Sequence, residues 1–65
     1  MNLNEVKTAV RRLAMYDNFW RSMLVNISEA AGYDGSWEWL ADAVNRANCK
    51  NADDIDCWYK SEMLV

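Results

Sequence analysis

The feature that most constrains this chain is an apolar repeat that runs through its first half. Apolar residues follow one another at alternating steps of three and four, with one interruption at Asp17. The repeat consists of Leu3, Val6, Val10, Leu13, Trp20, Leu24, Ile27 and Ala31. This spacing places the side chains on one stripe of an α-helix, whereas a strand alternates its faces at every second residue. The sequence therefore predicts amphipathic helices that need a surface to pack against.

The chain has 65 residues, which is enough for one small domain. Chains of this length bury roughly 60% of the surface that they expose when unfolded, and a core of this size leaves only about 3–5 kcal/mol of net stability. Four Trp, three Tyr, one Phe and four Met supply large apolar side chains, which disordered chains lack. We therefore expect residues 1–65 to form a single all-α domain, a small bundle of three to four short helices.

Two helices are predicted in the first half of the chain, over residues 3–16 and 18–31. Asp17 and Asn18 stand between them, and both residue types favour the position that caps the start of a helix. The sequence therefore favours a break at this point. One continuous helix over residues 3–31 is the alternative. It would be about 43 Å long and would need a dimer to cover it.

Short polar residues and a glycine mark the expected helix ends. Asn2 and Glu5 have the spacing of a capping box, in which each side chain binds the backbone N–H of the other residue. Ser36 and Asn51 are the expected N-caps of two further helices. Gly32 suits the left-handed position that ends a helix.

The two further helices are predicted over residues 37–48 and 52–63. In the first of them, seven apolar side chains spread over roughly 200° of the circumference, whereas a helix at the edge of a bundle needs little more than about 100°. They are Trp37, Trp39, Leu40, Ala41, Ala43, Val44 and Ala47. This helix is therefore either central or leaves a tryptophan edge for a partner. The stripe of the last helix consists of Ile55, Trp58, Tyr59 and Met63.

The chain contains no His, which removes the usual general base and the commonest metal ligand. Ser-His-Asp and Cys-His catalytic pairs are therefore excluded within one chain. Gly32 and Gly35 are the only glycines and form no phosphate-binding motif. Cys49 and Cys57 lack the further ligands that structural zinc requires. We expect a protein that is not an enzyme and that holds no metal or other cofactor.

Hydropathy and charge indicate the surroundings of the protein. No stretch of about 18 apolar residues predicts a membrane span, and the N-terminal segment lacks the apolar region of a signal peptide, so a cytoplasmic location is expected. The net charge is −3. Residues 1–28 are net basic and residues 29–65 are strongly acidic, an asymmetry that either cancels within the fold or attracts a basic partner. Overall acidity argues against nucleic acid as the main ligand.

Trp37 and Trp39 are the residues that we expect to anchor a partner, because Trp is enriched at interface hot spots. Glu38 and Asp42 would form a polar rim that attracts a basic protein surface. The expected function is a small acidic interaction module that binds another protein, as a homodimer or as an inhibitor or adaptor of a larger complex. The alternative role of both tryptophans is to fill the core.

Two other functions remain as alternatives. One is a small nucleic-acid-binding regulator that contacts phosphates with Lys7, Arg11, Arg12 and Arg21. Residues 27–32 resemble the first helix and turn of a helix-turn-helix motif, but Glu38 stands where that motif has a buried aliphatic residue. The other alternative is an acidic inhibitor that imitates nucleic acid.

Overall fold

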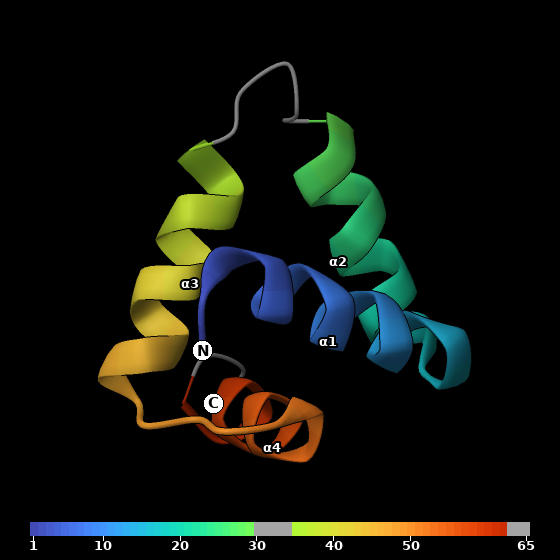
Figure 1. Ribbon diagram of the computed structural model, residues 1–65. Coiled ribbons are helices and arrows are strands. Elements are labelled where there is room, and N and C mark those ends of the chain that lie inside the picture. The colour runs from blue at the N-terminus through green and yellow to red at the C-terminus, as the bar shows by residue number, and fades with distance from the viewer. Residues whose placement is uncertain (30–34, 63–65) are drawn as a thin grey trace.

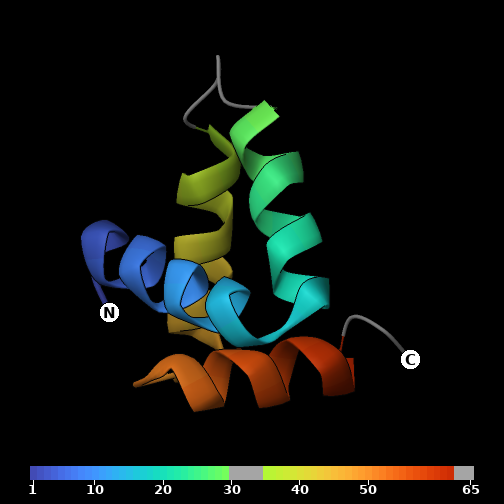
Figure 2. The ribbon, with the colours of Figure 1, turned by 90° about the vertical axis from the view of Figure 1, so that its right-hand side faces the viewer.

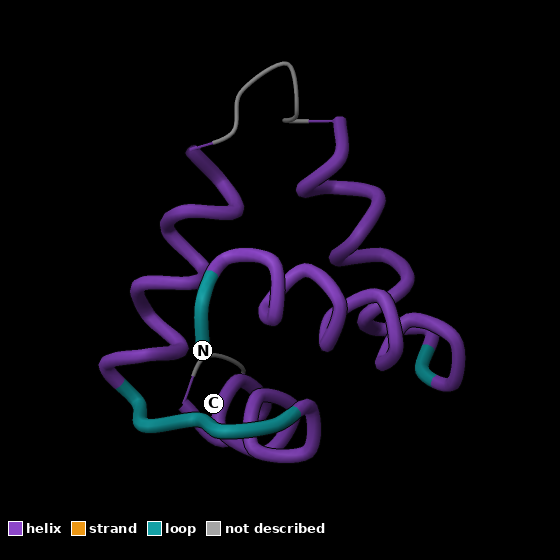
Figure 3. The backbone as a smooth tube through the Cα atoms, viewed as in Figure 1, coloured by secondary structure: helices purple, strands orange, loops and turns teal. Residues whose placement is uncertain are grey.

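Four helices make up the chain in the computed structural model, which describes residues 1–29 and 35–62 (Figure 1). They are α1 (Leu3–Tyr16), α2 (Asn18–Glu29), α3 (Gly35–Arg46) and α4 (Ala52–Glu62). The described residues form no strand (Figure 3), and the expected small all-α bundle is confirmed. In the same part of the chain, no helix has both the length and the apolarity to cross a membrane.

α1 begins with the capping box that the sequence predicts. The Asn2 side chain accepts a hydrogen bond from the Glu5 N–H at 2.9 Å, and the Glu5 carboxylate accepts one from the Asn2 N–H at 3.0 Å. These bonds satisfy backbone groups that the start of a helix leaves without partners. The bounds of α1 agree with the prediction, and its buried side chains are Val6, Ala9, Val10 and Ala14.

Asp17 separates α1 from α2 and caps both helices. Its backbone is extended, and its N–H donates to the Leu13 carbonyl at 2.9 Å as the last bond of α1. Its carboxylate accepts a hydrogen bond from the Phe19 N–H at 2.9 Å, the bond that makes Asp a good N-cap. The predicted break is therefore confirmed, and the alternative of one continuous helix is wrong.

α1 is the central helix of the bundle. It packs against α2, α3 and α4 (Figures 1 and 2). All four helices contribute to the fully buried core, which contains Val6, Val10, Trp20, Leu40, Val44 and Ile55. Because α1 occupies the centre, α3 lies at the edge and does not need apolar residues around its whole circumference.

The other helix boundaries depart from the prediction or lie beyond the described residues. α3 begins at Gly35, two residues earlier than expected, so Ser36 lies inside the helix and is not its N-cap. The predicted end of the second helix at Ala31, with Gly32 as its stop, lies outside the described residues. The same holds for Met63, the predicted end of the last helix.

α3 also ends two residues earlier than expected, at Arg46. The reason is Asn48, whose backbone is left-handed with φ 59°. Its N–H donates to the Asn45 carbonyl at 3.1 Å, and the Cys49 N–H donates to the Val44 carbonyl at 3.1 Å. This pair of bonds is a Schellman motif, which turns the chain away from the helix axis.

α4 begins with Asn51 as its N-cap, as predicted. The Asn51 side chain accepts from the Asp54 N–H at 2.8 Å, and the Asp54 carboxylate accepts from the Lys50 N–H at 3.0 Å. Asp53 and Asp54 lie in the first turn, where the helix dipole favours negative charge. These acidic residues thus stabilise a helix end. The described residues contain no group of three His, Cys, Asp or Glu that could hold a metal ion.

A series of polar contacts fastens α4 to the corner between α1 and α2. Trp20 is fully buried, and its indole N–H donates to the Asp56 carboxylate at 2.6 Å. The Lys60 ammonium, one turn further along α4, lies 3.0 Å from Asp56 and 2.5 Å from Asp17. Through Lys60, the residue that ends α1 and starts α2 is also tied to α4.

Candidate partner-binding groove

One side of α3 is buried and the other is open. Trp37, Leu40, Ala41 and Val44 form a helical stripe that packs into the core. Trp39 lies roughly 150° around the helix from the centre of this stripe, and 53% of its surface is exposed. The wide apolar arc predicted for this helix is therefore divided between core contacts and an exposed tryptophan edge.

The exposed edge of α3 borders a groove that it shares with α4. The groove has a volume of about 710 Å³ and is lined by Trp39, Asp42, Ala43, Arg46, Ala47, Trp58 and Glu62. We call it the α3–α4 groove. Two of its lining residues are alanines, whose short side chains leave the space beside the two indoles open.

Trp58 is an aromatic groove residue that the sequence did not single out for binding. The pattern placed it in the apolar stripe of the last helix, but it is only half-buried and lines the groove. Its ring packs edge-on against Tyr59, with the centroids 5.8 Å apart and an interplanar angle of 85°. An indole that another ring supports offers a large contact area at a small cost in side-chain entropy.

The charged side chains of the groove give it a negative balance. Asp42 and Arg46 form an ion pair of 2.9 Å across one turn of α3, and both side chains are exposed. Glu62 lines the α4 side, and Glu38 is exposed one turn before Asp42. An exposed pair of this kind contributes little to stability, so both of its members can reorient toward a partner at small cost.

Trp37 does not lie in this groove, which corrects the expectation that both tryptophans would anchor a partner. Only 5% of its surface is exposed, and the Lys7 ammonium lies 5.9 Å from the centroid of its ring. The two tryptophans are two positions apart and therefore point to different sides of the helix. Trp37 packs into the core, whereas Trp39 stays exposed, as do Glu38 and Asp42.

The four basic residues considered for nucleic-acid binding have different surroundings. Lys7 is half-buried against Trp37, whereas Arg11, Arg12 and Arg21 are exposed. The arginines belong to α1 and to the start of α2, so they are separate from the lining of the α3–α4 groove.

Both cysteines are free thiols, with Cys49 buried and Cys57 exposed. Burial raises the pKa of the Cys49 thiol, and the neighbouring Asp54 and Cys57 raise it further. A thiol with a raised pKa is a poor nucleophile at neutral pH. The surroundings of Cys49 therefore suit packing rather than chemistry.

Comparisons of the chain with protein-family models, with curated proteins and with solved structures found no match. Within the described residues, the α3–α4 groove combines the exposed indole of Trp39 with that of Trp58.

Proposed function

We propose that this protein is a non-enzymatic interaction module that binds another protein through the α3–α4 groove. The observation that carries the proposal is Trp39, which is 53% exposed and shares a groove of about 710 Å³ with Trp58. Trp side chains are enriched among the residues that dominate binding energy, because one indole buries a large area on contact.

The charge of the groove indicates the chemistry of the partner. Asp42, Glu62 and the nearby Glu38 outnumber Arg46, so a partner with Lys or Arg beside an apolar side chain is complementary. Such charges mainly set the specificity and the rate of association. An Arg of the partner could also stack on an exposed indole as a cation–π contact. The partner proposed here is therefore a basic protein segment with one large apolar anchor.

The sequence left open whether the partner is a second copy of the same chain, and the packing around α1 is relevant to this choice. Because α1 is covered by three helices of its own chain, a second copy is not needed to cover a long exposed helix. We therefore propose a different protein as the partner, with this chain acting as its adaptor or inhibitor. A cytoplasmic location is part of the same proposal.

A peptide-display library selected on the immobilised protein tests the proposed function. We expect the enriched peptides to combine Lys or Arg with an aromatic or large aliphatic residue. Trp39→Ala should weaken their binding by about thirtyfold, which corresponds to a hot spot of about 2 kcal/mol. Val25→Ala is the matched control, because Val25 is an exposed apolar residue on α2 (49%) and should leave binding unchanged.

Two outcomes would contradict the proposed function. One is a set of enriched peptides that binds Trp39→Ala as tightly as the original protein, while circular dichroism shows that the variant is folded. The other is a selection that enriches peptides without basic residues.

A further inference from the structure

A second surface, at the corner between α1 and α2, has a different chemistry from the groove. Three of the four arginines of the chain are exposed on the two helices that meet there: Arg11 and Arg12 on α1, and Arg21 at the start of α2. Arg12 also borders a pocket that includes Glu5. Met15 and Tyr16, at the end of α1, are 70% and 81% exposed, more than any other large apolar side chain in the described residues. We call the three arginines, Met15 and Tyr16 the arginine corner.

Helical spacing brings four of these residues together on α1. Arg11 lies four positions before Met15, and Arg12 lies four positions before Tyr16. Side chains with this spacing are neighbours on a helix surface, with about 5–6 Å between their Cβ atoms. Each exposed apolar side chain of the corner therefore has an arginine one turn before it on the same face of α1.

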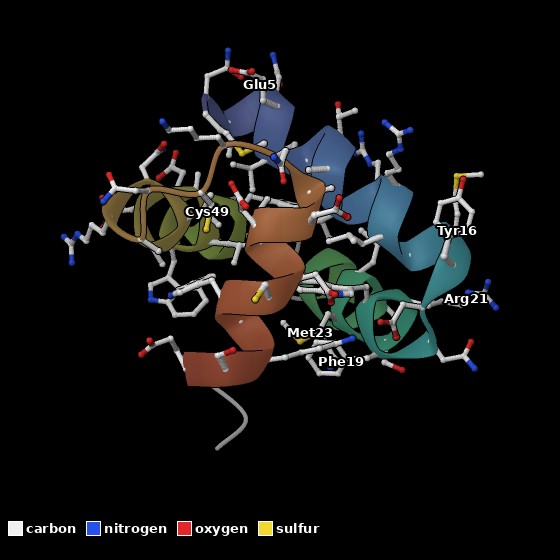
Figure 4. The ribbon with its side chains drawn as sticks, turned by 90° about the horizontal axis from the view of Figure 1, so that it is seen from below. Glu5, Tyr16, Phe19, Arg21, Met23 and Cys49 are labelled. Carbon is white, nitrogen blue, oxygen red and sulfur yellow. The ribbon has the colours of Figure 1, made fainter. Side chains whose placement is uncertain are left out.

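Arg21 reaches the same surface from α2. Its Nε donates to the carbonyl of Ala14, in the last turn of α1, at 3.3 Å. Tyr16 and Arg21 lie at one edge of the molecule, and Cys49 lies toward the opposite edge (Figure 4). The bond to Ala14 uses only Nε, so it orients the guanidinium group and leaves its terminal N–H groups for a ligand.

The positive charges of the corner are not neutralised by the described side chains. The three salt bridges found among them belong to Arg46 and Lys60. Asp17, the acidic residue next to Tyr16, binds Lys60 and the Phe19 N–H instead. Although the chain as a whole is acidic, this surface therefore presents three guanidinium groups that form no salt bridge with a described side chain.

We propose that the arginine corner binds single-stranded nucleic acid. Guanidinium groups form paired hydrogen bonds with phosphate oxygens, and the exposed ring of Tyr16 offers a platform on which an unpaired base can stack. A single strand fits better than a duplex, because a base inside a duplex is not free to stack on Tyr16. An acidic peptide would match the arginines but would leave the aromatic ring unused. This site is separate from the proposed protein-binding groove and does not depend on it.

Fluorescence anisotropy of a labelled oligothymidine, about 15 nucleotides long, tests this inference. Three phosphate contacts predict a slope of about −2 when the logarithm of the binding constant is plotted against the logarithm of the salt concentration. Binding should therefore weaken about twentyfold between roughly 50 and 200 mM salt. Arg12→Gln should make this slope shallower by about 0.7. Tyr16→Ala should weaken binding about tenfold and leave the slope unchanged.

Three variants serve as controls for this experiment. Lys50→Gln removes an exposed charge outside the corner and should not affect binding. Tyr16→Phe keeps the ring and should bind as the original protein does. Trp39→Ala removes the exposed indole of the other surface and should also bind normally, which separates this inference from the proposed function. Circular dichroism checks that each variant is folded, as expected for exposed positions.

The inference is overturned by any of three results. The first is the absence of binding at about 50 mM salt. The second is equal binding by Tyr16→Ala, which would mean that no base stacks on the ring. The third is a polyglutamate peptide that competes as well as the oligothymidine, which would mean that the corner recognises negative charge alone.

Discussion

The hydrogen bond between Trp20 and Asp56 allows the cost of one substitution to be worked out. Asp56→Ala removes the acceptor of a fully buried indole N–H, which now lies 2.6 Å from the carboxylate. A hydrogen bond to a charged group contributes about 1.5–3 kcal/mol, and Ala regains about 0.5 kcal/mol because it favours helix more than Asp does. We therefore expect the free energy of unfolding to fall by about 2 kcal/mol.

This loss is large for a chain of 65 residues, whose core supplies only about 3–5 kcal/mol. The melting temperature should fall by about 10 °C, and urea unfolding followed by far-UV circular dichroism measures the free energy directly. Asp53→Ala is the matched control, because Asp53 is an exposed residue of the same type in the first turn of α4. It should change stability by less than about 0.5 kcal/mol, since the lost dipole interaction and the gained helix propensity offset each other.

A double-mutant cycle attributes the effect to the indole N–H. Trp20→Phe keeps an aromatic ring but has no donor, so Asp56→Ala should cost much less in that background. If Asp56→Ala is as destabilising with Phe at position 20 as with Trp, the indole N–H does not account for the loss. An unchanged urea midpoint for Asp56→Ala alone would show that the hydrogen bond contributes nothing to stability.

Three other predictions concern stability. The hydrogen bond from Lys60 is the chief cause that lowers the pKa of Asp17 in the folded protein. The ionised Asp17 therefore stabilises the fold above its unfolded pKa, and this stabilisation is lost as the pH falls through the lower folded pKa. The urea midpoint should decline below about pH 4, and the decline should be smaller in Asp17→Asn. Asn48 has φ 59°, so Asn48→Val should cost about 1–2 kcal/mol in a urea titration, whereas Asn48→Gly should lose nothing. Trp37→Ala should cost about 3–5 kcal/mol, as much as the whole stability of a core of this size, so circular dichroism should show it largely unfolded. Trp39→Ala should cost less than about 1 kcal/mol and should still melt cooperatively; the reverse order would contradict the burial of the two side chains.

The parts of the fold that the sequence predicted correctly are those whose interactions are local. The capping box of Asn2 and Glu5, the break at Asp17 and the cap at Asn51 each join groups that are two or three residues apart. Local bonds of this kind leave a pattern in the sequence that can be interpreted without knowing the tertiary structure. The early end of α3 also depends on local bonds, but the sequence did not reveal it. Asn48 occupies the left-handed position at which glycine is usual, so the typical signal for a helix end is missing.

The groove could not be predicted to the same degree, because it depends on how the helices dock. The apolar arc of α3 left open whether this helix is central or leaves a tryptophan edge exposed, and it did not show which of Trp37 and Trp39 would be buried. Trp58 belongs to an ordinary apolar stripe, and only the position of α4 beside α3 brings it to the groove. The pairing of Lys60 with Asp17 joins residues that are 43 positions apart, and no periodicity reports such a contact.

The central place of α1 also determines how this molecule can open. Each of the other three helices packs against α1, so none of them keeps its main neighbour when α1 detaches. The backbone amides at Val6 and Val10, whose side chains are fully buried, should therefore exchange with solvent only when the whole chain unfolds. We therefore expect the described helices to unfold as one cooperative unit, so that the two proposed binding surfaces appear and disappear together.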